Sequence, residues 1–231
     1  MPGPAEPRPF PTGWESLLLL VPHPDDPEYV AAAAVAKWTA AGKTVRYALA
    51  CRGEAGIADM PAQQAGPIRE AEQRQAAAIV GVHPVEQVDF WDFCDSDIRN
   101  TPELRARIAA VIAETRPDVV VTIYGGAEFA PEAPNQRDHI EFAAAVTDAW
   151  DSLPDPPRWL FQNGPEPTHV ETVDGYLDAA VDSLAAHQVY LSVLDPHTPV
   201  RDQARAVVDM TTSDHADGRV AGFILQRTTI R

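Results

Sequence analysis

The residues best suited to chemistry stand in one short loop, which contains a histidine and two aspartates. The sequence Pro-His-Pro-Asp-Asp places His23 and Asp26 three residues apart, with Asp25 between them, directly after the apolar run 17–21. A continuous apolar run that ends at a turn signal predicts a buried parallel strand. Because ligands bind at the carboxyl ends of such strands, the polar residues of this loop are candidate site residues.

A second candidate pair, Asp138 and His139, follows the apolar run 119–123 and begins a predicted helix. Both loops leave the carboxyl ends of parallel strands, so we expect His23, Asp26 and His139 to converge at one edge of the sheet. Two imidazoles and a carboxylate, with a water in the fourth position, form a common catalytic zinc site. The same ligand set also occurs in non-haem iron oxygenases, so iron chemistry stays open on these residues alone.

Asp25 favours hydrolysis over oxygenase chemistry. A carboxylate that stands beside a metal ligand, and is not itself needed as one, can take a proton from a metal-bound water. A single His-x-x-Asp sequence is common by chance, and paired aspartates also suit the positive end of any helix dipole. The metal-site prediction therefore depends on the coincidence of two His/Asp loops at the same predicted edge.

Alternating strand and helix patterns position these loops. Strands are expected over 16–21, 44–50, 85–90 and 119–123, and helices over 28–41, 67–80, 101–116 and 138–151. This alternation predicts an α/β fold with a single doubly wound, mostly parallel, Rossmann-like sheet and helices on both faces. The C-terminal third is less regular, with short strands over 159–161 and 168–172, helical patterns over 176–194 and 200–210, and a strand or tail over 221–229.

Length and composition indicate a single domain over residues 1–231, with an extended arm over 1–14. The formal net charge of −16 disfavours nucleic acid as a partner, because an acidic chain repels phosphate backbones. Cys51 and Cys94 are too few for a disulfide framework and lack a Cys-x-x-Cys spacing. The proline-rich N-terminus is unlike a signal peptide, and no apolar run approaches the ~20 residues of a membrane helix. We therefore expect a cytoplasmic protein without membrane partners.

Several motifs together resemble those of the LmbE-like (PIG-L) zinc-dependent N-deacetylases. The opening Pro-His-Pro-Asp-Asp is the most specific of them, and Asp138-His139 is similar to the end of the family's His-Pro-Asp-His motif. Further similar segments lie at 50–56, 68–72, 76–82, 89–92, 116–122 and 183–187. The resemblance covers about residues 16–195 in order, and it implies an LmbE-like fold.

The resemblance implies that His23, Asp26 and His139 are the metal ligands and that Asp25 is the general base. The implied cofactor is Zn2+, with another divalent metal such as Fe2+ as the alternative.

The resemblance also places Glu54, Arg69 and Asp92 where the family contacts the polar substrate. Glu54 lies between two glycines on a strand-end loop, although a solvated loop acid explains it equally well. Arg69 stands in the first turn of a predicted helix, where a cation opposes the helix dipole and therefore needs a specific partner. The alternative interpretation of Asp92 is that it is an ordinary turn or cap residue.

The proton donor is the part of the predicted site where the sequence departs from the family pattern. Gln136 occupies the position of a family histidine, and glutamine can donate a hydrogen bond to an oxyanion but cannot supply a proton. Either Asp25 acts as both base and acid, or another group assists it, with His187 as the candidate. The alternative interpretation of His187 is a buried, hydrogen-bonded helix residue. We therefore predict catalytic roles for Asp25, Gln136 and His187.

The leading prediction is a zinc-dependent amidohydrolase that removes an acyl group, expected to be acetyl, from an amino sugar or sugar-containing small molecule, with the metal-bound water activated by Asp25. The alternative is a metal-binding but catalytically weak binding or scaffold protein of the same fold, which the substitution at Gln136 motivates. A nucleotide-binding domain is disfavoured, because the first strand-to-helix turn lacks a glycine-rich sequence and its carboxylates repel phosphate. Relatives often assemble, so formation of a homo-oligomer is left open.

Overall fold

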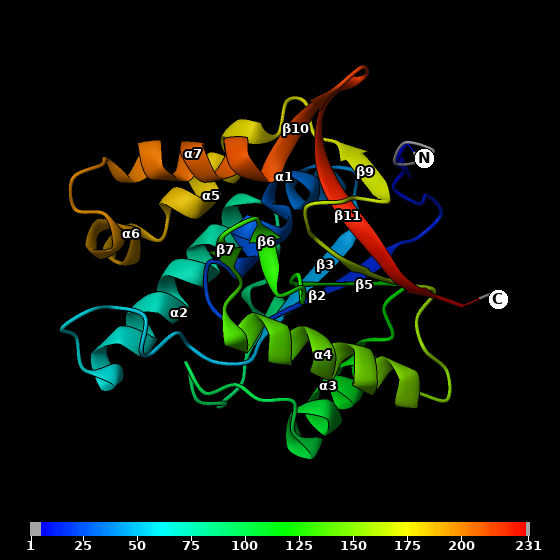
Figure 1. Ribbon diagram of the computed structural model, residues 1–231, viewed down its shortest axis with the longest axis horizontal. Coiled ribbons are helices and arrows are strands. Elements are labelled where there is room, and N and C mark those ends of the chain that lie inside the picture. Colours follow the sequence, from blue (N-terminus) through cyan, green and yellow to red (C-terminus); the bar gives the residue numbers. More distant parts are fainter. Residues whose placement is uncertain (1–5, 230–231) are drawn as a thin grey trace.

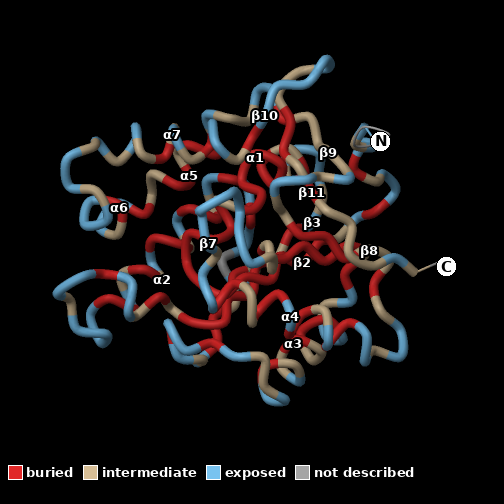
Figure 2. The backbone as a smooth tube through the Cα atoms, in the orientation of Figure 1, coloured by how far each residue is buried: buried red, intermediate tan, exposed pale blue. Residues whose placement is uncertain are grey.

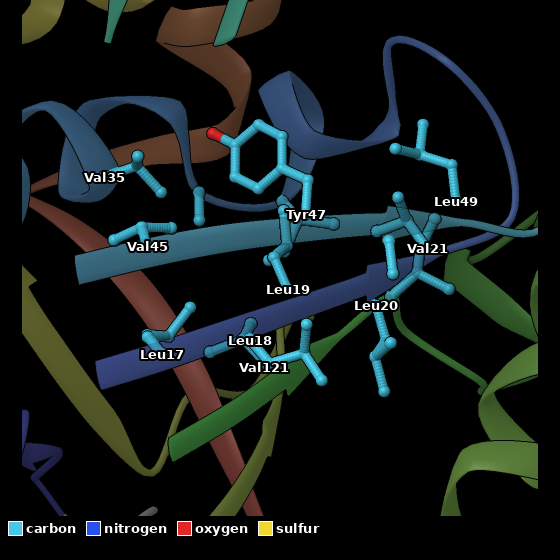
Figure 3. Close-up of a cluster of buried hydrophobic side chains, with 14 of the residues drawn as sticks. Leu17, Leu18, Leu19, Leu20, Val21, Val35, Val45, Tyr47, Leu49 and Val121 are labelled. Carbon is cyan, nitrogen blue, oxygen red and sulfur yellow. The ribbon is translucent and has the colours of Figure 1, made fainter. Parts of the chain in front are cut away.

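The strand that precedes the His-Pro-Asp-Asp sequence lies at the centre of the molecule. In the computed structural model, which describes residues 6–229, this strand is β2 (Ser16–Val21). Residues 18–20 are completely buried, and Figure 3 shows their side chains packed among those of the neighbouring strands. β3 (Thr44–Leu49) and β5 (Val119–Thr122) lie on either side of β2 and run parallel to it. Burial on both faces of the sheet explains the continuous apolar sequence.

The remaining strands extend this central group in both directions. They are β1 (Arg8–Pro9), β4 (Val88–Phe90), β8 (Trp159–Gln162), β9 (His169–Thr172), β10 (Thr212–His215) and β11 (Gly218–Thr228). Within the described residues the sheet order is β1-β9-β11-β8-β5-β2-β3-β4, and β10 pairs with β11 outside this path. The strands from β8 to β4 are all parallel, whereas β11 is antiparallel to β8 and β9. The predicted doubly wound, mostly parallel sheet is confirmed.

Helices cover both faces of the sheet. They are α1 (Asp26–Ala40), α2 (Ala62–Ile79), α3 (Pro102–Thr115), α4 (Arg137–Ser152), α5 (Leu177–Ala185), α6 (Gln188–Leu194) and α7 (Val200–Thr211), with a 3-10 turn at Val85–Gln87. Figure 1 shows α3 and α4 together on one side of the sheet, while α1, α5 and α7 pack against one another on the other side. Figure 2 shows the buried residues concentrated in the central strands and α1. None of the helices within residues 6–229 is long and apolar enough to span a membrane.

The structure differs from the sequence expectation at four main places. Residues 85–87, expected to begin a strand, form the 3-10 turn before β4. α2 begins at Ala62 instead of Pro67, because this proline removes one backbone hydrogen bond without ending the helix. The loop after β5 contains a short hairpin formed by β6 (Glu128–Ala130) and β7 (Ala133–Pro134). The single helix expected over 176–194 divides into α5 and α6, with the break at His187.

The two chain ends add strands to the sheet. Residues 1–5 of the expected N-terminal arm lie outside the described residues. The rest of the arm is not free, because Arg8–Pro9 pairs with β9 and both Phe10 and Trp14 are buried. At the other end, the expected strand is confirmed as β11, and it forms a hairpin with β10 that the sequence did not indicate.

The strand order creates a switch point between β2 and β5. From β2 the chain continues outward to β3 and β4, and it then returns to the other side of β2 to form β5 and β8. The connections that leave β2 and β5 therefore pass to opposite faces, and the carboxyl ends of such strands are where ligands bind in open α/β sheets. Asp25, in the loop after β2, and His139, in the first turn of α4, lie beyond these strand ends, as the sequence predicted.

Candidate active site

Three predicted metal ligands meet at the ends of β2 and β5. His23, Asp26 and His139 are all buried, and one donor atom of each lies within 4.8 Å of the other two. The His23 Nδ1–Asp26 Oδ2 distance is 3.2 Å, and the His139 Nε2–Asp26 Oδ1 distance is 3.3 Å. Donor atoms that bind zinc tetrahedrally at their usual bond lengths lie about 3.4 Å from one another. The spacing of this donor cluster therefore suits a single ion.

Two properties of the donor cluster fit a cation. His139 Nε2 is buried and has no hydrogen-bond partner, although it lies beside the Asp26 carboxylate. A buried polar atom without a partner lowers stability, and a bound metal ion would satisfy this nitrogen. Burial lowers the pKa of His23, but hydrogen bonds to Asp138 and Asp26 outweigh burial and raise this pKa to about 10. The carboxylates around the imidazole therefore attract positive charge.

Neighbouring side chains hold the two imidazole rings in place. His23 Nε2 lies 3.2 Å from Asp138 Oδ2 and 3.4 Å from Asp95 Oδ1. On the other ring, His139 Nδ1 lies 3.1 Å from Asn135 Oδ1. Partners of this kind fix the orientation of a ligand histidine and increase its basicity. The sequence analysis did not identify Asn135 as a partner of His139. Its position four residues before His139 was the signal that could have identified it.

We expect Asn135→Ala to weaken zinc binding by about 10-fold to 100-fold, the usual effect of removing an outer partner of a ligand histidine. The Asn135 side chain also donates to the carbonyl oxygens of Tyr124 and Gly126, so its loss frees both His139 and the loop after β5. Competition with a chromogenic chelator measures the zinc dissociation constant. Asn100→Ala is the matched control, because Asn100 bonds to Asp148 instead. Equal dissociation constants for the two variants would exclude the orienting role.

A second donor set shares one residue with the first. His23, Cys51 and Asp95 also place one donor atom each within 4.8 Å of the other two. These residues follow β2, β3 and β4, whereas the first set follows β2 and β5. Burial raises the pKa of the Cys51 thiol well above its usual value, so this thiol is protonated unless a cation is bound. Cys51 belongs only to the second set and His139 only to the first, so separate substitutions of these residues show which set binds an ion.

Asp25 lies beside the donor cluster in an uncommon backbone conformation. Its φ of 81° is in the left-handed region, which aspartate and asparagine adopt more readily than most residues. The Asp25 N–H donates to Gln73 Oε1 at 2.8 Å, and Asp25 Oδ1 accepts from Arg69 Nη2 at 2.8 Å. Burial raises the pKa of Asp25 to about 6, although the charge of Arg69 lowers it. A carboxyl group in such surroundings is suited to proton transfer near neutral pH.

Arg69 has a specific partner, although it lies in the interior of α2 (Ala62–Ile79) and not in the first turn that the sequence predicted. Its Nη2 donates to the Pro24 carbonyl at 2.6 Å as well as to Asp25, and the residue is only 3% exposed. The structure therefore places Arg69 behind the carboxylate that it holds. The contact of Arg69 with substrate stays a prediction.

Glu54 and Asp92, the other predicted substrate contacts, also have protein partners. The Glu54 carboxylate accepts from the backbone N–H groups of Arg52 and Asp95, and it thereby ties together the loops that follow β3 and β4. Asp92 is exposed and pairs with Arg52. Neither residue belongs to the donor cluster, and their roles toward substrate stay predictions.

The two residues predicted to assist Asp25 lie in opposite surroundings. Gln136 is exposed and forms the N-cap of α4, close to the donor cluster in sequence. His187 is fully buried, and its Nε2 lies 3.2 Å from Glu28 Oε2. Such burial matches the alternative interpretation of His187 as a buried, hydrogen-bonded residue, although His187 lies between α5 and α6 and not within a helix. The catalytic roles of both residues stay predictions.

Glu28 is the centre of a buried polar cluster that the sequence did not indicate. Its carboxylate accepts from Gln73 Nε2 at 3.2 Å and from Ser183 Oγ at 3.0 Å. Because Gln73 also accepts from the Asp25 N–H, this cluster supports the backbone of the loop after β2. The signal in the sequence was a set of polar residues in alanine-rich helices, but helical periodicity does not identify their partners.

Comparison with known families identifies the scaffold of this site. The PIG-L family, described as GlcNAc-PI de-N-acetylase, matches the chain over residues 18–150. The chain belongs to the PIG-L family. The matched segment extends from β2 into α4 and therefore includes both loops of the donor cluster. The resemblance that the motifs carried is confirmed.

The relatives of this PIG-L chain include named deacetylases. A probable N-acetyl-alpha-D-glucosaminyl L-malate deacetylase 2 of Bacillus anthracis is 27% identical over 186 residues, which are 74% of this chain and 79% of the relative. The N,N'-diacetylchitobiose deacetylase of Pyrococcus horikoshii has a similar fold, with a TM-score of 0.78 and 15% identity over 92% of this chain and 84% of that chain. These relatives are hydrolases of amide bonds, the class that the sequence predicted.

A third relative limits what the fold alone implies. GalB, the 4-carboxy-2-hydroxymuconate hydratase of Pseudomonas putida, has a TM-score of 0.64 and 18% identity over 93% of this chain and 99% of that chain. The same architecture therefore accommodates a different reaction, and the function must be argued from the side chains of the site.

Proposed function

We propose that this chain is a metal-dependent N-deacetylase that hydrolyses the acetamide group of an N-acetylated amino sugar. The observation that carries the proposal is the Asp25 carboxylate, which lies beside two histidines and an aspartate at the carboxyl ends of β2 and β5. A general base next to a three-donor cluster is suited to hydrolysis of an unreactive amide.

His23, Asp26 and His139 would hold the ion, and two imidazoles with one carboxylate suit Zn2+, with Fe2+ as the alternative. A bound divalent ion polarises the amide carbonyl and lowers the pKa of a bound water. Asp138 and Asn135 would keep the two imidazole rings oriented.

Asp25 supplies the proton transfers. Arg69 holds its Oδ1, which leaves Oδ2 to accept a proton from the attacking water. The protonated carboxyl group then returns this proton to the amide nitrogen as the carbon–nitrogen bond breaks. Acetate and the free amine leave in equal amounts. The Gln136 side-chain amide is the candidate donor to the oxygen that becomes negative during attack.

The proposed substrate class comes from what the relatives are named for. An N-acetylglucosaminyl malate and diacetylchitobiose both carry N-acetylglucosamine, and the PIG-L description also contains this sugar. We therefore expect the reactive end of the substrate to be N-acetylglucosamine, attached to a second small group.

A panel of N-acetylglucosaminyl malate, diacetylchitobiose and an N-acetylglucosaminyl inositol tests this function. We expect equimolar release of acetate and primary amine from at least one of them, loss of the reaction after removal of metal with a chelator, and recovery when zinc is added. Binding without amine release across the panel would favour the binding or scaffold protein. Hydration of 4-carboxy-2-hydroxymuconate would instead favour the reaction of GalB.

A further inference from the structure

Arg69 is enclosed on several sides at the point where it holds Asp25. Its guanidinium carbon lies 3.9 Å from the centre of the Tyr190 ring. The loop after β3 is also in contact with the guanidinium group, because a Cβ atom at Gly53 or at Gly56 would collide with Arg69 Nη1. Only glycine at these two positions leaves space for the arginine. The guanidinium plane is therefore confined by a glycine loop and an aromatic ring.

Hydrogen bonds alone do not fix this guanidinium group. Arg69 Nη2 makes the two short bonds, to the Pro24 carbonyl and to Asp25. Nη1 reaches the Gly53 carbonyl only at 3.5 Å, and Nε is buried without a hydrogen-bond partner. Because both short bonds are on one nitrogen, packing must hold the rest of the guanidinium plane. The aromatic ring and the glycine loop provide this packing.

Tyr190 belongs to α6, in the C-terminal third, beyond the residues that the PIG-L family matches. An aromatic ring over a guanidinium group attracts it through the charge distribution of the ring, and the attraction is stronger away from water. We propose that Tyr190 is a positioning residue, which acts through Arg69 to hold the Asp25 carboxylate at the donor cluster. This inference rests on the proposed role of Asp25 as general base.

The inference concerns the ring of Tyr190 and not its hydroxyl group. Tyr190→Phe keeps the ring, whereas Tyr190→Leu removes it and retains an apolar side chain. We expect Tyr190→Phe to keep kcat within about twofold of the wild-type value. We expect Tyr190→Leu to lower kcat by about 10-fold to 100-fold, the size of effect caused by a misplaced catalytic group. KM and the stoichiometry of bound zinc should stay unchanged in both variants.

Arg69→Lys tests whether Tyr190 acts through the guanidinium group. Lysine keeps the charge but loses the flat group that stacks on the ring. Addition of Tyr190→Leu to Arg69→Lys should lower kcat by less than threefold further, because the stacked pair is already lost. Trp159→Leu is the matched control, since Trp159 stacks on Arg158 at 4.1 Å and should leave kcat unchanged. Fully additive losses, or an equal loss in Tyr190→Phe, would overturn the inference.

A crystal structure of zinc-loaded Tyr190→Leu separates failure of this inference from failure of the proposed function. We expect Arg69 to leave Asp25 or to occupy several orientations in that variant, whether or not a substrate is known. An Arg69–Asp25 contact that is unchanged from wild type would overturn the positioning role. Loss of this contact in a protein that deacetylates no substrate would support the positioning role while rejecting the deacetylase.

Discussion

Asp25→Asn is expected to lower kcat for deacetylation by about 100-fold to 10,000-fold, the range that a general acid–base group contributes. Asparagine retains the shape of the side chain and readily adopts the left-handed backbone conformation with φ of 81°. It also keeps an oxygen that can accept the hydrogen bond from Arg69, but it cannot take a proton from water. Acetate release measures the rate, and elemental analysis should show unchanged bound zinc.

The choice of asparagine separates the chemical role from the structural one. Alanine at this position would add backbone strain to the loss of the carboxylate, so its effect would be mixed. Asp151→Asn is the control, because Asp151 is a surface carboxylate paired with Arg227 and should tolerate the same change. A fully zinc-loaded Asp25→Asn protein that retains more than about a tenth of the wild-type kcat would exclude Asp25 as the base.

His139→Ala is expected to abolish stable zinc binding and, with it, activity. Removal of an outer partner already weakens metal binding by about 10-fold to 100-fold, so loss of a ligand should exceed that effect. Elemental analysis after dialysis should find about one zinc per wild-type chain and much less than one in the variant. Because a ligand that binds only the folded state raises its stability, zinc should increase the Tm of the wild type but not of His139→Ala.

Two control variants show which donors hold the metal. His197→Ala removes an exposed histidine and should leave zinc content and Tm unchanged. Cys51→Ser removes the thiol of the second donor set and should also retain zinc, since the first set does not contain it. If Cys51→Ser loses zinc and His139→Ala retains it, the ion must be assigned to the second donor set, His23, Cys51 and Asp95.

Much of the fold could be predicted from local sequence. The apolar runs that form β2 and β5 are buried on both faces, and the helices between the parallel strands follow from periodicity and from residues such as Thr101, whose side chain caps α3. The convergence of His23, Asp26 and His139 also followed from the sequence, because parallel strands align their carboxyl ends. This convergence depends only on the direction of the strands and on the position of each residue after a strand.

The C-terminal third could not be predicted to the same extent. β11 lies between β8 and β9, and its antiparallel pairing joins residues that are 48 to 69 positions apart. The sequence of an individual strand does not specify its partner strand, because the same hydrophobic pattern fits any half-buried strand position. The break at His187 was missed for a related reason, since the helical pattern continues on both sides of it.

The roles of Arg69 and His187 show the same limit within the site. The sequence predicted a cation at the start of a helix and a histidine in a late helix, whereas Arg69 lies in the interior of α2 and His187 lies between α5 and α6. Their contacts come from Asp25 and Glu28, which precede them by more than forty and more than one hundred and fifty residues. Which polar groups pair inside a protein depends on how helices pack, and this packing is a property of the whole chain.

The sequence by itself determined the alternation of the main strands and helices from β2 to α4, the strand ends that carry the site, and the residue types able to bind a metal and transfer a proton. These features depend on short-range periodicity and on the direction of parallel strands. The tertiary structure alone decided that Arg69 holds Asp25, that Tyr190 covers Arg69, and that His187 is buried against Glu28. Each of these contacts joins elements that are distant in the sequence, and their geometry exists only when the helices are packed on the sheet.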